Sequence, residues 1–325
     1  MIIFFVHSKT IPTATDILTA ASRIRPYIHR TPVLTSSSIS KLFDCQLFFK
    51  CENMQKAGVF KSRGACNAVF ALDDNSIIKG VATHSSGNHA AALSRAAKLR
   101  GTKAYIVMPN NSSKVKIAAV ERYGGIITFC QPNLASREST LASLIEDTDA
   151  VEIHPYNEPL VIEGQATATL ELLEDYPDLD IILAPVGGGG LLSGTALAAS
   201  YFCRKTIVIA AEPEQADDAY RSFHIKSFVP SINPDTIADG LRTSLGSITH
   251  QIILKYVNDI VTTSEDAIIS AMKLVWERMK IVIEPSAAVP IAALMEDKIR
   301  CRNKRIGVIL SGGNVDLSNL PWQQA

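Results

Sequence analysis

The sequence predicts an α/β protein in which mostly parallel sheets are covered by helices. Two observations support this fold class. From residue 80 onward, short β-rich runs alternate with helical segments, as they do in strand–helix–strand units. Several runs are apolar throughout rather than alternating, which is typical of strands buried on both faces. The chain has 325 residues, enough for one large or two modest domains, each with its own core.

The elements follow in order from these runs. The predicted strands lie at residues 81–83, 104–108, 126–129, 151–154, 181–185, 207–211, 259–262 and 306–310. The predicted helices lie at residues 90–99, 115–122, 136–146, 163–174 and 191–202. Residues 264–280 have the clearest helix ends, because Ser264 can cap the first turn and Arg278 and Lys280 suit the negative C-terminal end. Residues 213–239 are polar and contain prolines, so we expect an irregular surface excursion there.

Charge and composition exclude several classes of partner. Lys and Arg number 32, and Asp and Glu also number 32, so no global field recruits nucleic acid or anionic lipid. The apolar run at residues 2–6 lacks a basic flank and is too short for a secretory signal. No other run approaches the length that spans a bilayer. We therefore expect a small-molecule substrate or another copy of the chain as partner.

The cysteines indicate a reducing compartment. The six cysteines, at positions 45, 51, 66, 130, 203 and 301, form no CxxC pair and look like reduced thiols, several of them in the core. Together with the missing signal segment, they predict a cytoplasmic protein.

The first segment that carries chemistry is A-G-V-F-K-S-R-G-A, at residues 57–65. Lys61 stands between glycines and next to Phe60, and its amine can form an imine with an aldehyde cofactor. Most lysines are simply solvated, so this segment alone favours a solvated lysine over a catalytic one.

The second segment is S-S-G-N-H, from Ser85 to His89, which follows a predicted strand and opens a predicted helix. Its small residues leave backbone N–H groups free to bind an anion such as a substrate carboxylate. A plain Ser or Asn helix cap explains the segment equally well. The pattern favours a structural role for His89 over a role as a base.

The third segment is a run of four glycines, from Gly187 to Gly190, between a strand and a helix. Glycines without side chains over the amides suit a phosphate cradle. No register gives G-x-G-x-x-G, although Glu212 lies where a ribose-binding acid would, so a nicotinamide enzyme stays a weak alternative. No Gly-Lys-Ser/Thr follows, which excludes a P-loop.

These segments and S-G-G-N-V-D at 311–316 together resemble the fold-type II pyridoxal-phosphate family, specifically its branch of serine racemases and serine/threonine dehydratases. The resemblance extends from T-P-V-L at 31–34 nearly to the end of the chain. It implies two three-layer α/β domains in the tryptophan synthase β-like architecture. Residues 1–71 and 153–325 would form the large cofactor-binding domain. Residues 72–152 would form an inserted small domain that closes over the substrate.

The resemblance implies pyridoxal 5'-phosphate as the cofactor, held covalently by Lys61. Phe60 would pack on its ring, Asn88 would contact its phenolic oxygen, and Ser311 would face the ring nitrogen. The phosphate-side residues would be Gly187, Gly188, Gly189, Gly190 and Leu191. A serine hydroxyl cannot keep the ring nitrogen protonated as a carboxylate would. The carbanion at Cα is then short-lived, which favours reprotonation or β-elimination over transamination.

The resemblance also implies how the reaction divides between racemisation and elimination. Lys61 would serve one face of the Cα–H bond, and Ser86 the other, with a hydroxyl tuned by its neighbours. Threonine-type dehydratases typically carry alanine at this position, so Ser86 favours a serine racemase with serine β-elimination as a side reaction. If Ser86 only binds carboxylate, the chain is a dehydratase of serine, threonine or 3-hydroxyaspartate without significant racemisation.

Contacts to the substrate and to a metal ion complete the implied site. The substrate contacts would be Ser85, Ser86, Asn88, His89, Arg137 and Thr243. E-P-E-Q-A-D-D at 212–218 resembles the cation loop of the family, where Glu212, the Ala216 carbonyl and Asp218 would bind. All-oxygen ligation suits Mg²⁺, or Ca²⁺ or Mn²⁺, rather than zinc. An acidic surface turn is the alternative for this loop.

Two further expectations concern regulation and assembly. Family members of the mammalian type bind ATP as an activator at a subunit interface, and the chain is expected to be a homodimer. The candidate ATP residues are Ser36, Ser37, Lys116, Arg278, Lys280 and Asn314. A non-enzyme alternative remains, namely an inactive cofactor-binding or interaction protein. The intact Lys61 and Ser86 argue against this alternative.

Overall fold

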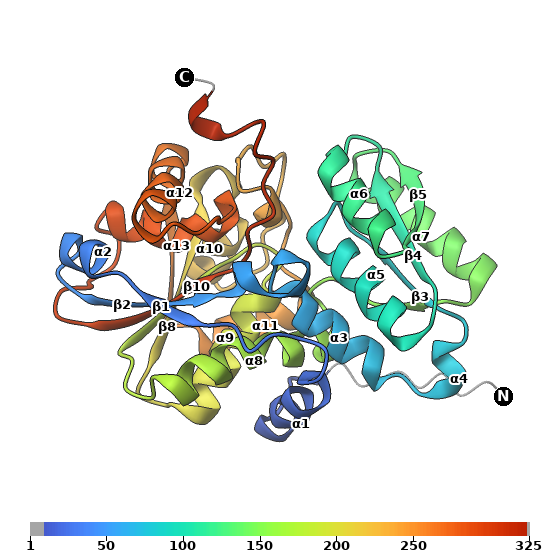
Figure 1. Cartoon of the computed structure of the whole chain (residues 1–325), viewed down its shortest axis with the longest axis horizontal. Coiled ribbons are helices and arrows are strands. Elements are labelled where there is room, and N and C mark those ends of the chain that lie inside the picture. Colours follow the sequence, from blue (N-terminus) through green and yellow to red (C-terminus); the bar gives the residue numbers. More distant parts are fainter. Residues whose placement is uncertain (1–9, 324–325) are drawn as a thin grey trace.

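The computed structural model describes residues 10–323 and contains two sheets (Figure 1). The larger sheet has six strands in the order β1-β2-β10-β7-β8-β9, and the smaller has four in the order β5-β4-β3-β6. In the described chain β1 runs antiparallel to β2, and the other strand pairings are parallel. The predicted α/β class with mostly parallel sheets is therefore confirmed.

The strands of the two sheets come from separate parts of the sequence. The larger sheet contains β1 (Val33–Thr35), β2 (Gln46–Cys51), β7 (Ile181–Pro185), β8 (Ile207–Pro213), β9 (Asp259–Thr263) and β10 (Arg305–Leu310). The smaller sheet contains β3 (Val81–His84), β4 (Ala104–Pro109), β5 (Ile126–Cys130) and β6 (Val151–Glu152). The central strand β7 is buried along its whole length, as expected for an apolar run in the middle of a parallel sheet.

Helices cover both faces of the larger sheet. One face packs on α2 (Ser37–Leu42), α12 (Glu265–Met279) and α13 (Pro285–Met295). The other face packs on α8 (Pro159–Asp175), α9 (Gly190–Phe202), α10 (Asp218–Ile225) and α11 (Ser247–Tyr256). Each face buries its own apolar cluster, which makes this half a three-layer structure.

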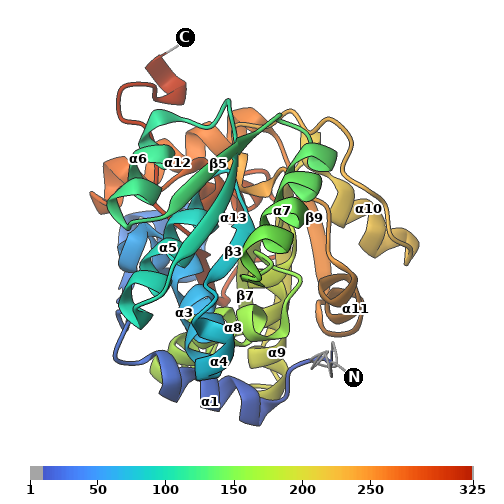
Figure 2. The ribbon, with the colours of Figure 1, turned by 90° about the vertical axis from the view of Figure 1, so that its right-hand side faces the viewer.

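The smaller half is built in the same way. It contains α4 (Asp74–Ile77), α5 (Asn88–Arg100), α6 (Lys114–Arg122) and α7 (Leu134–Thr148). Figure 2 turns this half toward the viewer, with α5 and α6 on one side of the sheet and α7 on the other. The 3-10 helices of the chain are η1 (Glu52–Met54), η2 (Lys56–Gly58), η3 (Glu214–Ala216), η4 (Asp239–Leu241) and η5 (Pro321–Gln323).

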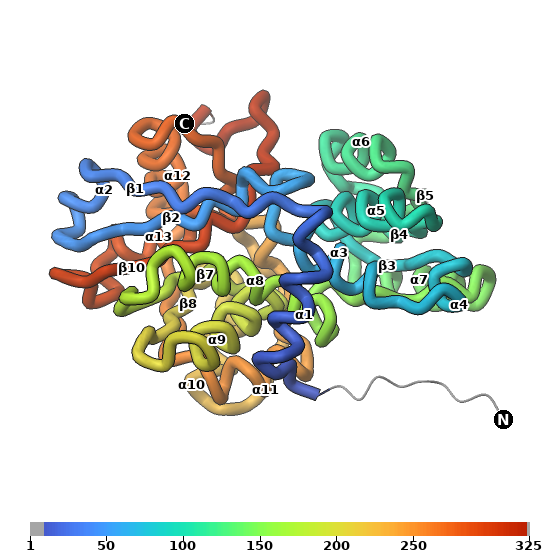
Figure 3. Tube along the Cα trace, turned by 60° about the horizontal axis from the view of Figure 1, so that its bottom comes forward, coloured from blue at the N-terminus to red at the C-terminus, as the bar shows by residue number. Residues whose placement is uncertain are grey.

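Two helices lie at the junction of the halves. The helix α3 (Lys61–Ala71) contacts α5 of the smaller half and α8 of the larger one. The helix α1 (Ala14–Ile24) packs on α3, α8 and α9 (Figure 3). The chain thus leaves the larger half after α3 and returns to it at α8.

Several element predictions differ from the structure. Strands β1 and β2 and helices α1 to α4 lie before residue 80, where no element was predicted. The surface excursion at 213–239 is wrong in part, because α10 forms there and buries Ala219 and Phe223. Ser264 caps its helix as predicted, accepting a hydrogen bond from the Ala267 N–H at 3.3 Å.

All strands of the smaller sheet lie within residues 72–152. The division into domains at 71/72 and 152/153 stays a prediction, and residues 1–9, including the N-terminal run at 2–6, lie outside the described residues. None of the described helices is both long enough and apolar enough to cross a membrane.

Candidate active site

The run of four glycines connects β7 to α9 and has no room for side chains. A Cβ at Gly187 would lie 2.8 Å from the Leu241 Cα, and one at Gly188 would lie 2.4 Å from the Tyr156 ring. Gly189 has a left-handed φ of +86° and no side chain that could cap the helix. The first N–H groups of α9 are therefore not capped by the Ncap side chain. This arrangement fits an anion such as a phosphate.

Lys61 is the first residue of α3. Its Nζ donates a hydrogen bond to the Pro155 carbonyl at 2.7 Å and lies 5.2 Å from the centre of the Phe60 ring. Burial lowers the pKa of Lys61 to about 8. The amine is therefore neutral, and nucleophilic, in a larger fraction of molecules near neutral pH than an ordinary lysine.

The backbone around Lys61 joins the end of β10. The Phe60 N–H donates to the Ser311 carbonyl at 3.0 Å, and Val59 forms an isolated antiparallel bridge with Gly312. Ser311 is buried. Lys61, the residue predicted to hold the cofactor, and Ser311, the residue predicted to face its ring nitrogen, therefore come from neighbouring segments.

Asn88 begins α5 and contacts Glu284, a buried acid that the sequence analysis did not identify. Its Nδ2 donates to both oxygens of Glu284, at 3.1 and 3.2 Å, and its Oδ1 accepts from the Asn314 Nδ2 at 2.9 Å. Burial and the charge of Asp239 raise the pKa of Glu284 to about 7. The available signal was Glu284-Pro285, an acid directly before a proline that begins a helix.

The serines of S-S-G-N-H lie at the C-terminal end of β3. The Ser85 Oγ accepts from the Gly87 N–H at 3.3 Å, and Ser86 is half-buried. His89 is buried, and one ring nitrogen lies 3.2 Å from the Ile153 carbonyl. Burial holds the pKa of His89 well below its usual value, so the ring is neutral and not a cation for the substrate carboxylate.

Arg137 and Thr243 come from different halves of the molecule and both lie near Tyr156. Burial raises the pKa of Tyr156 to about 12, and Thr243 lies near enough to lower it somewhat. Arg137, in the first turn of α7, lies near enough to lower the pKa of Tyr156 by its charge. Sequence reasoning missed Tyr156, because nothing in its local sequence marks it.

The predicted metal ligands lie together at the end of β8 and the start of α10. Glu212 and Asp218 are both fully buried. Glu212 accepts from the N–H groups of Ala219 and Tyr220, at 3.1 and 2.7 Å. Neither Asp218 oxygen meets a donor in good hydrogen-bond geometry, although Ser231 lies near enough to lower its pKa somewhat.

The charged forms of Glu212 and Asp218 are disfavoured. Burial and the neighbouring Asp218 raise the pKa of Glu212 well above its usual value, and burial raises that of Asp218 to about 7. No group of three or more His, Cys, Asp or Glu side chains within residues 10–323 could hold a metal ion. The Glu212 and Asp218 carboxylates are hard oxygen donors, and the predicted set that adds the Ala216 carbonyl would suit a hard divalent cation.

The six candidate ATP residues are not all brought together in one chain. Lys116 and Asn314 line a cavity of about 370 Å³ between the two halves, and the Lys116 ammonium pairs with Asp239. Ser36 and Ser37 are at the start of α2, whereas Arg278 and Lys280 are at the end of α12. Figure 1 shows both of these helices away from α6, which carries Lys116.

Comparison with known proteins gives the family. Residues 24–312 match the family model described as pyridoxal-phosphate dependent enzyme. The chain is 51% identical over 312 residues to a β-hydroxyaspartate dehydratase of Paracoccus denitrificans (strain Pd 1222), covering 96% of this chain and 99% of the relative. It is 50% identical over 313 residues to a serine racemase of Dictyostelium discoideum, covering 95% and 96%.

Solved structures agree with these relatives. The structure of maize serine racemase superposes with a TM-score of 0.93 at 45% identity, covering 97% of each chain. The predicted family and the fold-type II architecture are thereby confirmed. The chain belongs to the family of pyridoxal-phosphate-dependent enzymes.

Proposed function

We propose that this chain is a serine racemase that interconverts L- and D-serine and also eliminates water from serine to give pyruvate and ammonia. The observation that carries the proposal is that the chain has both Lys61, with its depressed pKa, and Ser86, in the loop that precedes Asn88. Relatives named serine racemase at 50% identity over nearly the whole chain support it.

The residues present fit pyridoxal phosphate. The amine of Lys61 is buried enough to be partly neutral, Phe60 lies beside it, and the glycine run has no room for a Cβ where a phosphate would bind. Leu191 is buried directly behind that run. When bound, the cofactor supplies an electron sink for the charge that develops at Cα.

The side chains divide the proton transfers between them. Lys61 takes the Cα proton on one face, a task suited to a pKa of about 8. Ser86 delivers a proton to the other face in racemisation. In elimination the β-hydroxyl leaves instead. Ser85, Asn88 and the start of α5 bind the substrate carboxylate, because Gly87 provides no side-chain cap for that helix.

The remaining substrate contacts come from both halves of the molecule. Arg137 is suited to bidentate carboxylate binding, and Thr243 offers a hydroxyl near Tyr156. His89 supports the site through its contact with the Ile153 carbonyl. Residues 72–152 act as a small domain that closes on the large one (1–71 and 153–325), excludes water and brings Ser86 to Cα.

The proposal includes a divalent cation, Mg²⁺ or alternatively Ca²⁺ or Mn²⁺, held by Glu212, Ala216 and Asp218. It also includes a cytoplasmic homodimer with a regulatory ATP site. In that site a partner chain would unite Lys116 and Asn314 with the residues on α2 and α12. The cavity beside Lys116 supports the site.

The deciding experiment incubates the protein with L-serine, pyridoxal phosphate and Mg²⁺, and measures D-serine by chiral chromatography and pyruvate in the same tube. D-serine is the expected product, accompanied by pyruvate. Pyruvate without D-serine would overturn the racemase assignment. Ser86→Ala is expected to lower racemisation about 100-fold or more and to change elimination much less.

A second candidate function is dehydration of 3-hydroxyaspartate. The relative at 51% identity that carries that name favours it, as does Arg137 near the Tyr156 hydroxyl, since an arginine suits a second substrate carboxylate. Comparing kcat/KM for 3-hydroxyaspartate, threonine and serine separates the candidates. A preference for 3-hydroxyaspartate with no D-serine formed assigns the chain to the dehydratases.

A further inference from the structure

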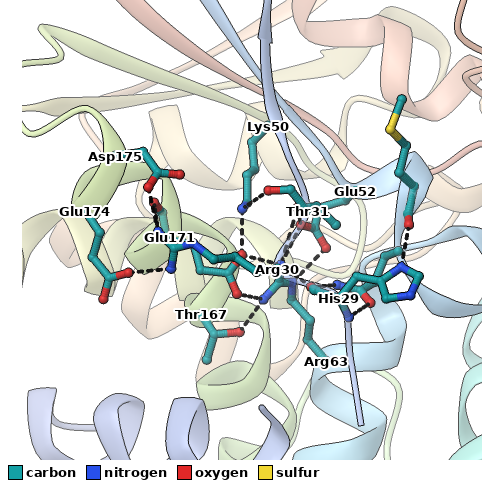
Figure 4. A network of polar contacts seen from close by, with 12 residues as sticks. His29, Arg30, Thr31, Lys50, Glu52, Arg63, Thr167, Glu171, Glu174 and Asp175 are labelled. Carbon is teal, nitrogen blue, oxygen red and sulfur yellow. Dashed lines mark hydrogen bonds and ion pairs between the residues drawn. The ribbon is translucent and has the colours of Figure 1, made fainter. Parts of the chain in front are cut away.

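The most extensive buried polar cluster in the described chain surrounds Arg63, two residues after Lys61 (Figure 4). Its Nε and Nη2 donate to the two oxygens of Glu52, at 2.7 and 2.8 Å. Its Nη1 and Nη2 donate to the two oxygens of Glu171, both at 2.8 Å. Nη1 also donates to the Thr167 hydroxyl at 3.1 Å.

This arrangement uses the whole guanidinium group. A guanidinium has five N–H donors in a fixed planar fork, and the five contacts to Glu52, Glu171 and Thr167 account for all of them. Two of the partners are bidentate carboxylates, the strongest class of hydrogen-bonded ion pair. A lysine at position 63 would keep the charge but could not make these contacts together.

The rest of the cluster balances its charge. Lys50 is fully buried and its Nζ donates to Glu171 at 2.6 Å and to the Thr31 carbonyl at 2.8 Å. The Thr31 hydroxyl donates to Glu52 at 2.6 Å. Two cations thus face two carboxylates. Such clusters are often no more stabilising than an apolar core of the same shape, so stability alone does not explain this one.

What the cluster does is join three segments. Arg63 belongs to the first turn of α3, Glu171 to the last turns of α8, and Glu52 to the turn η1 directly after β2. The helix α8 begins four residues after Pro155, whose carbonyl accepts the hydrogen bond from Lys61. The cluster therefore connects the helix that carries Lys61 to the segment that binds its amine.

The helices α3 and α8 also approach each other closely at two glycines. A Cβ at Gly164 would lie 2.6 Å from the Arg63 carbonyl oxygen, and one at Gly64 would lie 2.5 Å from the Gln165 Nε2. Backbone contact at this crossing and the forked ion pairs set the rotation and the position of α3 on α8. On its other side the lysine is held by the bond from Phe60 to Ser311.

We propose that Arg63, clamped between Glu52 and Glu171, is a positioning residue that fixes the first turn of α3 and thereby the place of the Lys61 amine at the cofactor. The proposal rests on the proposed function only in taking Lys61 as the residue that binds pyridoxal phosphate. Its consequence is geometric, because small misplacements of a reacting group lower rates strongly.

The test compares Arg63→Lys and Glu171→Gln with two controls in the holoenzyme. Arg30→Met removes an exposed ion pair to Glu174 and Asp175 on the same helix. Leu170→Ala destabilises α8 from its opposite, apolar side without touching the cluster. The readouts are the pH titration of the lysine-bound cofactor absorbance, kcat, KM and thermal unfolding.

The expected result separates the two classes of variant. Arg63→Lys and Glu171→Gln shift the absorbance titration and lower kcat about 10- to 100-fold, while KM changes less than about 3-fold. Arg30→Met and Leu170→Ala leave the titration in place, even where Leu170→Ala unfolds at the lower temperature. If Arg63→Lys does not fold, Glu171→Gln and Thr167→Val carry the same comparison.

Two different failures remain distinguishable. If borohydride reduction of the wild-type protein does not fix the cofactor on Lys61, the proposed cofactor linkage and this inference are both wrong. If Lys61 is labelled but the cluster variants titrate and turn over like wild type, or like Leu170→Ala, the inference alone is overturned.

Discussion

Two pairs of buried carboxylates in this molecule have opposite surroundings. Glu52 and Glu171 enclose Arg63 and, with Lys50, form a cluster in which each charge has a counter-charge. Glu212 and Asp218 are fully buried, but Asp218 has no partner in good hydrogen-bond geometry within the described residues. The first pair contains its own cations, whereas burial raises the pKa values of both acids in the second pair and so favours their protonated forms.

The pKa directions express the same contrast. Burial alone would raise the pKa of Glu171, but Arg63 and Lys50 outweigh it and the pKa is lowered. At Asp218 burial dominates and raises the pKa to about 7. Burial therefore does not decide the charge state of an acid by itself, because what matters is whether a cation is buried with it.

The largest expected effect comes from removing the internal cation. Arg63→Met leaves Glu52 and Glu171 facing only Lys50, so the free energy of unfolding should fall by about 3–5 kcal/mol. Urea unfolding followed by circular dichroism measures this. A loss below about 1 kcal/mol would mean that the cluster is solvated enough to tolerate the missing charge.

The second effect concerns the pair that lacks a cation. Adding Mg²⁺ at 100 times its Kd should raise the free energy of unfolding by about 2.7 kcal/mol. Asp218→Asn should abolish this gain, while Glu174→Gln, on the exposed pair with Arg30, should keep it. Equal stabilisation of wild type and Asp218→Asn would argue against the site.

A pH series sharpens the comparison further. An acid with a raised pKa stabilises the fold in its protonated form, so without metal the contribution of Asp218 is lost as pH rises from about 4 to about 7. Saturating Mg²⁺ should flatten this decline. Glu171 has a lowered pKa and acts oppositely, since its contribution is lost as pH falls. Thermal unfolding between pH 4 and 8, with EDTA or Mg²⁺, measures both.

The smallest effect is expected at the solvent-exposed edge of the first cluster. Arg30 pairs with Glu174 and Asp175 at 2.6 Å, but these side chains are about half exposed. Arg30→Met should therefore change the free energy of unfolding by less than about 1 kcal/mol. Adding 1 M salt should change this difference between variant and wild type little. A loss as large as that of Arg63→Met would contradict the distinction between buried and exposed pairs.

Features read from local sequence were predicted best. Lys61, the glycine run and S-S-G-N-H each combine a motif with a strand or helix end, and the structure has them at such ends. Arg63 and Tyr156 could not be assigned in this way. Glu171, the partner of Arg63, lies 108 positions away, and no local period or composition reports a contact across that distance.

The separation of Arg63 and Glu171 also has a consequence for how the chain folds and diversifies. The contact closes a loop that contains the whole smaller sheet, and the entropy of closing a loop rises only slowly with its length. Insertions or exchanges within residues 72–152 therefore add little to the free-energy cost of joining α3 to α8. Evolution can alter the smaller sheet and its helices while α3 keeps its place on α8.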